Sequence, residues 1–262
     1  MDRRTLLDRA ARGGDERILL AHVLDKYEQC AQRNVPAATG FLSPAGQRAA
    51  QELLHAAAIH AGFAFCGGYD RAERKMLIFL PDWQDAADES EYMAALRCTY
   101  RKEDALTHRD FLGSLMAQGV TRETLGDILV AEGSADLIVS RDIAPYLLQN
   151  VAGAGRVKLS VSEIALSELR VPELKVKELR DTVSTLRLDA VAACGFSMSR
   201  GKAQELIASG RVQLNHRETI KSDAPVAEGD VISARGLGKF EIAEVGGVSK
   251  KGRTALLLRR YL

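Results

Sequence analysis

Leu186-Arg187-Leu188-Asp189 is followed by Ser199-Arg200-Gly201-Lys202-Ala203 and then by Gly210-Arg211-Val212-Gln213-Leu214-Asn215. Together these three segments predict two helices and a strand in the C-terminal part of the chain. Apolar residues at helical spacing predict a helix from Leu186 to Cys194, capped by Ser184 or Thr185, and a second helix capped by Ser199. Gly210 supplies a left-handed turn after the second helix. Alternation of apolar and polar residues then predicts a strand.

The residues after this strand predict the rest of a small sheet. Asn215-His216 forms a tight turn, because Asn tolerates positive φ. Later turns at Glu228-Gly229-Asp230 and at Ser249 to Arg253 separate further apolar alternations that predict strands near Val231-Ile232, Phe240 to Ile242 and Ala255 to Leu258. We therefore predict one compact α+β domain over 181–262.

Basic side chains surround this unit at positions that helix stability does not explain. Arg200 and Lys202 in the first turn of a helix oppose its dipole, at a cost of at most about 1 kcal/mol each. An external anion would offset that cost, although a solvated basic face is the plain alternative. We predict an RNA-binding surface made of Arg187, Ser199, Arg200, Lys202, Gln204, Arg211, Asn215, His216, Lys221, Arg235 and Lys239. Phosphate contacts position a ligand without reading its sequence, so folded RNA recognised by shape is the expected partner, with no DNA specificity.

The charge distribution is consistent with this surface. Residues 181–262 hold 13 Lys and Arg against 9 Asp and Glu, a balance of about +4, whereas the rest of the chain is close to −3. The cysteines Cys30, Cys66, Cys98 and Cys194 are widely spaced without a Cys-x-x-Cys pair, so neither a disulfide framework nor a zinc site is indicated. We expect a cytoplasmic protein with no membrane span, no metal and no cofactor.

Two domains are predicted before the C-terminal one. Residues 1–90 read as mostly helical, with one helical segment from Leu6 to Tyr27, another after Ser43-Pro44, and a short β hairpin around Phe63 and Leu77. Residues 91–171 predict the order strand, helix, strand, strand, helix, strand, the ferredoxin-like arrangement that RNA-recognition folds also use. Topology alone does not imply RNA binding, and the usual aromatic stacking sequence is absent. A charged connector or short edge strand follows at 172–180.

The C-terminal motifs resemble, in order, those of the RNA-binding domain named after ribosomal small-subunit protein four, the S-four domain. The matching pieces are Arg187-Leu188-Asp189, Ser199-Arg200-Gly201-Lys202-Ala203, Gly210 to Asn215, and Val226-Ala227-Glu228-Gly229-Asp230. Leu214 replaces the usual Val, and His216 replaces the usual Gly. Inside such a module Asp189 is expected to pair with a neighbouring arginine.

Over nearly its full length the chain resembles the YlmH-like family of bacterial S-four proteins. The supporting segments are Gly67-Gly68-Tyr69, Ala72-Glu73-Arg74, His108 to Gly113, Arg122, Leu125 to Ile128, and Lys250 to Arg253. The resemblance implies an RNA-recognition-like middle domain before the S-four domain. It also implies a non-catalytic RNA-binding protein on the ribosome, in some members on large-subunit complexes that carry stalled peptidyl-tRNA. A second RNA or ribosome contact is predicted from His108, Arg109, Arg122, Lys250, Lys251 and Arg253.

Three hypotheses follow for the function. The first is a monomeric accessory factor that binds ribosomal RNA or transfer RNA on the ribosome or its large subunit, without catalytic residues. The second is an RNA-modifying enzyme anchored by the S-four domain, for which 1–180 offer no methyl-donor glycine loop and no paired carboxylates. The third is a protein-docking factor whose RNA binding is confined to the C-terminal part.

Overall fold

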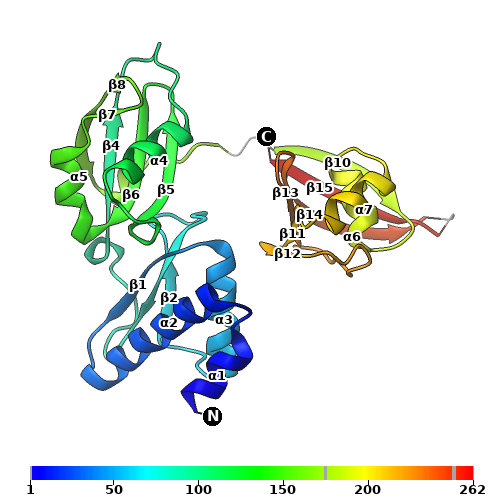
Figure 1. Cartoon of the computed structure of the whole chain (residues 1–262), viewed down its shortest axis with the longest axis horizontal. Coiled ribbons are helices and arrows are strands. Elements are labelled where there is room, and N and C mark those ends of the chain that lie inside the picture. The colour runs from blue at the N-terminus through cyan, green and yellow to red at the C-terminus, as the bar shows by residue number, and fades with distance from the viewer. Residues whose placement is uncertain (1, 174–175, 250–251, 262) are drawn as a thin grey trace. The chain divides into compact units, whose positions relative to one another are not determined.

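The structure is a computed structural model that describes residues 2–173, 176–249 and 252–261. The chain divides into two compact units, Met1–Pro172 and Glu173–Leu262. Each unit combines helices with antiparallel sheets (Figure 1), which confirms the predicted α+β class. The first unit runs through the boundary expected near residue 90. The division into 1–90, 91–171 and 181–262 therefore stays a prediction.

The N-terminal part of the first unit is a three-stranded sheet packed against three helices. The helices are α1 (Arg3–Ala10), α2 (Gly14–Arg33) and α3 (Pro44–Ala56), and the strands β1 (Ala37–Leu42), β2 (Phe63–Cys66) and β3 (Lys75–Phe79) lie in the order β1-β3-β2. The predicted start of α3 is confirmed, because Ser43 Oγ accepts a hydrogen bond from the Gly46 amide and Pro44 occupies the first turn. Two expectations were wrong. The first helical segment is two helices separated at Gly13, and β1 makes the hairpin a three-stranded sheet.

The middle part of the first unit follows the predicted element order. Its elements are a 3₁₀ turn η1 (Glu89–Glu91), β4 (Met93–Thr99), α4 (His108–Ala117), η2 (Arg122–Thr124), β5 (Leu125–Ala131), β6 (Ser134–Ser140), η3 (Arg141–Ile143), α5 (Ala144–Asn150), β7 (Gly153–Ala154), β8 (Val157–Lys158), β9 (Ser160–Ile164) and η4 (Leu166–Glu168). The sheet order β5-β6-β4-β9 places the first and third strands in the centre, as in ferredoxin-like folds. The last predicted strand, 157–161, is in fact two, because Val157-Lys158 pairs back on β7.

Both faces of this middle sheet are covered. Leu96, Leu137 and Val139 face the core that contains residues of α4 and α5. On the other face Met93 and Ile138 pack in one cluster with Phe41, Cys66, Met76 and Ile78 of the N-terminal sheet. RNA-recognition folds stack bases on an open sheet face, and this sheet does not offer one.

The C-terminal segment of the first unit closes the remainder of that face. Arg97 forms an ion pair with the buried Asp136 through two hydrogen bonds of 2.7 Å. The backbone around η4 then binds this pair, because Arg97 Nη2 donates to the Glu168 carbonyl at 2.7 Å and the Arg170 amide donates to Asp136 Oδ2 at 2.8 Å. The sheet edge and the outer faces of α4 and α5 are left at the surface.

The second unit packs two helices against one face of a six-stranded antiparallel sheet (Figure 1). The elements are β10 (Val176–Val183), α6 (Leu188–Gly195), α7 (Arg200–Ala208), β11 (Val212–Leu214), β12 (Arg217–Glu218), β13 (Val231–Ala234), β14 (Gly238–Val248) and β15 (Thr254–Tyr261), in the sheet order β10-β15-β14-β13-β11-β12. The alternative of an edge strand near 172–180 is therefore correct, since β10 lies at one edge.

Helix α6 begins later than expected and is capped by Arg187 without a side-chain bond. Leu186 lies outside the helix, and its carbonyl accepts the Val226 amide at 3.1 Å.

Two glycines in these helices predict opposite effects on stability. A Cβ on Gly195 in α6 would lie 2.2 Å from a ring carbon of the buried Phe240, whereas a Cβ on Gly201 in α7 would meet nothing within 4 Å. We expect Gly195→Ala to destabilise the second unit by about 2 kcal/mol through overpacking. Gly201→Ala is expected to stabilise it by about 0.5 kcal/mol, because alanine gives the unfolded chain less backbone entropy to lose on folding. Amide hydrogen exchange of α6 and α7 measures both changes. Equal effects of the two variants would contradict this packing.

Candidate nucleic-acid interface

A buried carboxylate gathers three predicted RNA-binding side chains in the second unit. Asp189, in the first turn of α6, has a fully buried side chain. Its oxygens accept hydrogen bonds from Gln204 Nε2 at 2.8 Å, from Arg200 Nε and Nη2 at 3.1 Å each, and from Arg187 Nε and Nη2 at 3.4 Å each. We call these four residues the Asp189 cluster. The predicted pairing of Asp189 with a neighbouring arginine is confirmed.

The electrostatics of the Asp189 cluster favour an external anion. Burial opposes ionisation of Asp189, but the hydrogen bonds from Gln204 and Arg200 and the Arg200 charge outweigh it and hold the Asp189 pKa below its ordinary value. One carboxylate therefore faces two guanidinium groups, which leaves an excess positive charge. The Arg187 and Arg200 side chains stay 39% and 48% exposed. Because Asp189 occupies only Nε and Nη2 of each, further N–H donors remain for a phosphate.

Local sequence explains how α7 presents this cluster. Ser199 caps the helix, since its Oγ accepts the Lys202 amide at 3.3 Å. Arg200 and Gln204 are one turn apart and share a flank of the helix. Lys202 lies about 160° around the axis from Arg200, at 3.6 residues per turn, so it belongs to another flank. The predicted surface is therefore not one continuous patch on α7.

The loop after β12 brings a further predicted cation to the Asp189 cluster. The Ser222 carbonyl accepts the Asp189 amide and the Ala224 carbonyl accepts the Leu188 amide, both at 2.9 Å. This places the loop against the first turn of α6. Lys221, the preceding residue, is exposed there. Lys221 can thus extend the cluster toward a ligand.

The remaining predicted residues form separate groups. Arg211 and Arg235 lie together, because the Arg235 amide donates to the Arg211 carbonyl at 3.1 Å, and Arg211 Nε donates to Ser209 Oγ at 3.0 Å. Lys239 lies on the face of the sheet opposite α6 and α7, with its ammonium 5.1 Å from the centre of the Tyr261 ring. Lys239 and Arg200 therefore do not lie on one face of the second unit, so the predicted surface is not continuous between them. Because side chains alternate along β14, Phe240 is buried on the helix side and Lys239 points to the other face.

The turn between β11 and β12 has a structural role. Asn215 and His216 both adopt positive φ, 52° and 64°, as expected for a two-residue hairpin turn. Asn215 Nδ2 donates to Asp230 Oδ1 at 2.7 Å, and Asn215 Oδ1 accepts the Val231 amide at 3.0 Å. The Asn215 side chain thus ties the turn to β13. Its contribution to RNA binding, like that of His216, stays a prediction.

The second predicted contact divides between the two units. His108 at the start of α4 lies close enough to Arg122 to feel its charge. Partial burial and this charge together lower the His108 pKa. Arg109 is exposed beside them. In the other unit Arg253 donates from Nε to Thr182 Oγ1 at 2.8 Å and from Nη2 to the Thr182 carbonyl, which ties β15 to β10. Lys250 and Lys251 lie outside the described residues.

Sequence reasoning missed the carboxylate that organises the first unit. Asp127 in β5 accepts hydrogen bonds from the Tyr69 hydroxyl at 2.8 Å, the Glu73 amide at 2.7 Å and the Arg74 amide at 3.0 Å. Arg74 in turn donates to the carbonyls of Phe41, Arg122 and Leu125. The family-like segments around Tyr69, Glu73-Arg74, Arg122 and Leu125 to Ile128 therefore meet at one packing junction. The available signal was that each of these segments resembles a motif of the same family.

Neither a metal site nor a membrane-spanning helix finds support in the described part of the chain. Within residues 2–173, 176–249 and 252–261, no three His, Cys, Asp or Glu side chains gather as metal ligands would. No helix among those residues has the length and apolar character needed to cross a bilayer.

Comparisons with known proteins agree with this architecture. The family model described as "Putative RNA-binding domain in YlmH" matches residues 90–168. The Bacillus subtilis (strain 168) protein named ribosome-associated protein quality control protein P2 is 35% identical over 247 residues, which are 94% of this chain and 95% of that protein. The structure of the cell division protein ylmH from Streptococcus pneumoniae superposes with a TM-score of 0.50 at 20% identity, over 62% of this chain and 98% of that one.

Fold and sequence together define the class of this protein, an α+β protein with a ferredoxin-like part that matches an RNA-binding-domain model. The full-length similarity then decides the particular family: the chain belongs to the YlmH-like family.

Proposed function

We propose that this chain is a non-catalytic RNA-binding protein that associates with the ribosome and contacts ribosomal RNA or transfer RNA through the Asp189 cluster. The observation that carries the proposal is the buried Asp189 carboxylate, which holds the partly exposed Arg187 and Arg200 guanidiniums in fixed positions. Ordering these side chains in advance lowers the entropic cost of binding a phosphate. The S-four-like order of motifs supports RNA as the source of that phosphate.

The relative at 35% identity supports a more specific role. That protein is named for ribosome-associated protein quality control, and we propose the same process here, acting as a cytoplasmic monomer on stalled large-subunit complexes. We expect the chain neither to cleave nor to modify RNA. Mass spectrometry of ribosomal and transfer RNA from a deletion strain should show every modification present.

The first unit is proposed to contribute only an accessory RNA contact. Its middle sheet is covered on both faces, so base stacking on that sheet is not available. His108, Arg109 and Arg122 lie at the start of α4 and in η2, outside the covered face. We propose them as the accessory contact, with the second unit supplying most of the affinity.

Ribosome binding should depend strongly on salt. If about five cations of the chain meet phosphates, a slope of about −0.7 per contact gives roughly a hundredfold loss of affinity between 50 and 200 mM salt. Co-sedimentation with large subunits across that range measures the slope. A binding constant that does not change with salt would contradict a phosphate-dominated interface.

A further inference from the structure

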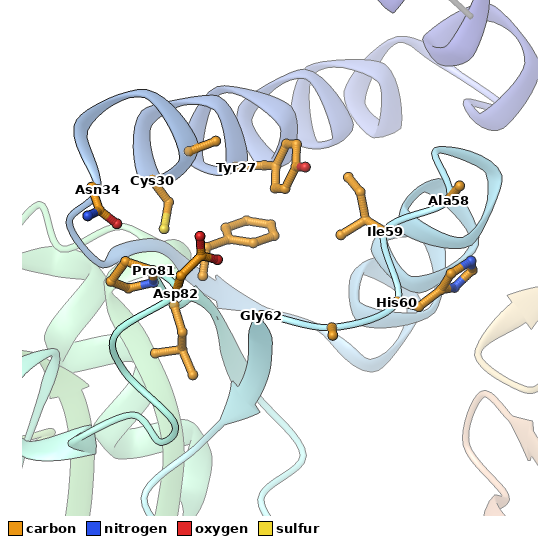
Figure 2. A pocket seen from close by; sticks show the side chains of 13 residues that line it. Tyr27, Cys30, Asn34, Ala58, Ile59, His60, Gly62, Pro81 and Asp82 are labelled. Carbon is orange, nitrogen blue, oxygen red and sulfur yellow. The ribbon is translucent and has the colours of Figure 1, made fainter.

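The first unit contains a cavity of about 370 Å³ that the RNA interface does not use. It lies between the C-terminal end of α2, the loop after α3 and the end of β3 (Figure 2). The lining includes Tyr27, Cys30, Asn34, Phe79 and Asp82. This volume falls within the range of small-ligand sites.

The polar part of the cavity carries negative charge. Asp82 is exposed and takes part in no hydrogen bond or ion pair with any described residue. In Figure 2 its carboxylate lies beside Cys30, and burial together with the Asp82 charge raises the Cys30 pKa. Helix α2, which is 20 residues long, ends at this side of the cavity with Asn34 as its C-cap. Carbonyl groups at a helix C-terminus favour cations. Arg33, in the last turn of α2, is exposed and is not among the lining residues.

The apolar part of the cavity is aromatic. The rings of Tyr27 and Phe79 meet edge to face, with centroids 5.6 Å apart. Aromatic faces attract a flat organic cation, and the attraction grows when water is excluded. A guanidinium fits both parts, because it stacks on an aromatic ring while it donates to a carboxylate. His60 lies at the far end of the cavity from Asp82 (Figure 2).

The rim indicates a protein as the source of the cation. Trp83, next to Asp82, is 63% exposed, and its indole nitrogen donates to the Asn34 carbonyl at 3.0 Å. Val35 beside it is also an exposed apolar side chain. Asp85 and Asp88 continue the acidic character along the chain. Exposed Trp next to a pocket for Arg is a combination that protein interfaces favour.

We infer that this cavity of the first unit is a docking pocket for an arginine side chain of a basic protein segment. The guanidinium pairs with Asp82 and stacks against Tyr27, and the flanking residues of the segment pack on Trp83 and Val35. The inference does not depend on the Asp189 cluster, which lies in the other unit, or on His108, Arg109 and Arg122, which do not line this cavity.

Trp83 is the only tryptophan of the chain, so its fluorescence reports on this pocket without a label. We expect N-acetyl-L-arginine amide to change the emission of the full-length protein in a saturable way. The citrulline analogue, which has the same shape without the charge, should leave it unchanged. Asp82→Asn should weaken the arginine compound about tenfold. The matched control Asp85→Asn, which also removes an exposed carboxylate but one outside the cavity lining, should not.

The source of the cation is tested with a five-residue peptide that carries arginine between apolar residues. It should bind at least about tenfold more tightly than the amide, since it also covers Trp83 and Val35. Spermidine binding more tightly than the peptide would overturn the assignment to a protein partner. An equal response to citrulline, or an unchanged affinity in Asp82→Asn, would overturn the pocket itself. Asp82→Asn should leave RNA binding unchanged. A failure of the arginine pocket can therefore be told apart from a failure of the proposed RNA-binding function.

Discussion

Replacing Arg187 and Arg200 together by glutamine is expected to weaken binding to large ribosomal subunits about thirtyfold at fixed salt. Each guanidinium supplies charge-assisted hydrogen bonds that a neutral amide cannot replace. The salt dependence should change as well, because the loss of two phosphate contacts lowers the slope of log affinity against log salt by about 1.4. Co-sedimentation at several salt concentrations measures both quantities.

The control for this variant removes two charges elsewhere in the same unit. Lys177→Gln with Arg180→Gln changes exposed residues of the edge strand β10, so the net charge changes equally. We expect a loss of affinity of threefold or less. If the two double variants lose affinity equally, the interface is a diffuse basic surface and the Asp189 cluster has no special part in it.

Charge reversal would be a poorer test at this site. Glutamate at position 200 would face the buried Asp189 carboxylate, which already accepts hydrogen bonds from three side chains. Two carboxylates in a buried site repel, so the helices themselves would be disturbed. Lys202, exposed on another flank of α7, tolerates reversal, and Lys202→Glu separates that flank from the Asp189 cluster.

Asp189→Asn is expected to destabilise the second unit by about 2 kcal/mol at neutral pH. Removing one partner of a buried ion pair leaves the others without their counter-charge, although the exposure of Arg187 and Arg200 moderates the cost. Hydrogen exchange of amides in α6 and α7 measures this local stability. Exchange in the first unit should not change, because the core that contains α6 and α7 lies wholly within the second unit.

The same variant predicts a pH dependence. The folded pKa of Asp189 lies below its unfolded value, which is about 3.9 for an ordinary Asp. The stabilisation by the carboxylate is therefore fully present above about pH 4 and is lost as the pH falls through the folded pKa. Wild type and Asp189→Asn should differ in stability at pH 7 and converge in strong acid. A difference that stays constant with pH would show that ionisation of Asp189 does not stabilise the fold.

Local signals in the chain predicted most of the elements. Ser43-Pro44 and Ser199 mark helix starts because a capping hydroxyl acts on amides within three residues. Asn215-His216 marks a hairpin because both residues enter the left-handed region. Strand β1 was missed, since Thr39-Gly40 interrupts its apolar alternation and its stability comes from pairing with β3. The site was predicted only in part: three residues of the Asp189 cluster were named as RNA-binding, but not the carboxylate that gathers them.

The α+β class, the order of elements and the cations of the C-terminal part could be read from the sequence, because caps, turns and periodicity act over a few residues. Which of these elements face one another became visible in the folded structure. It covered the middle sheet with residues from β1 and β3, brought Arg187, Arg200 and Gln204 to one buried carboxylate, and turned Lys239 to the opposite face. Such arrangements follow from burying apolar surface between segments distant in the chain, and no short window of sequence contains both partners.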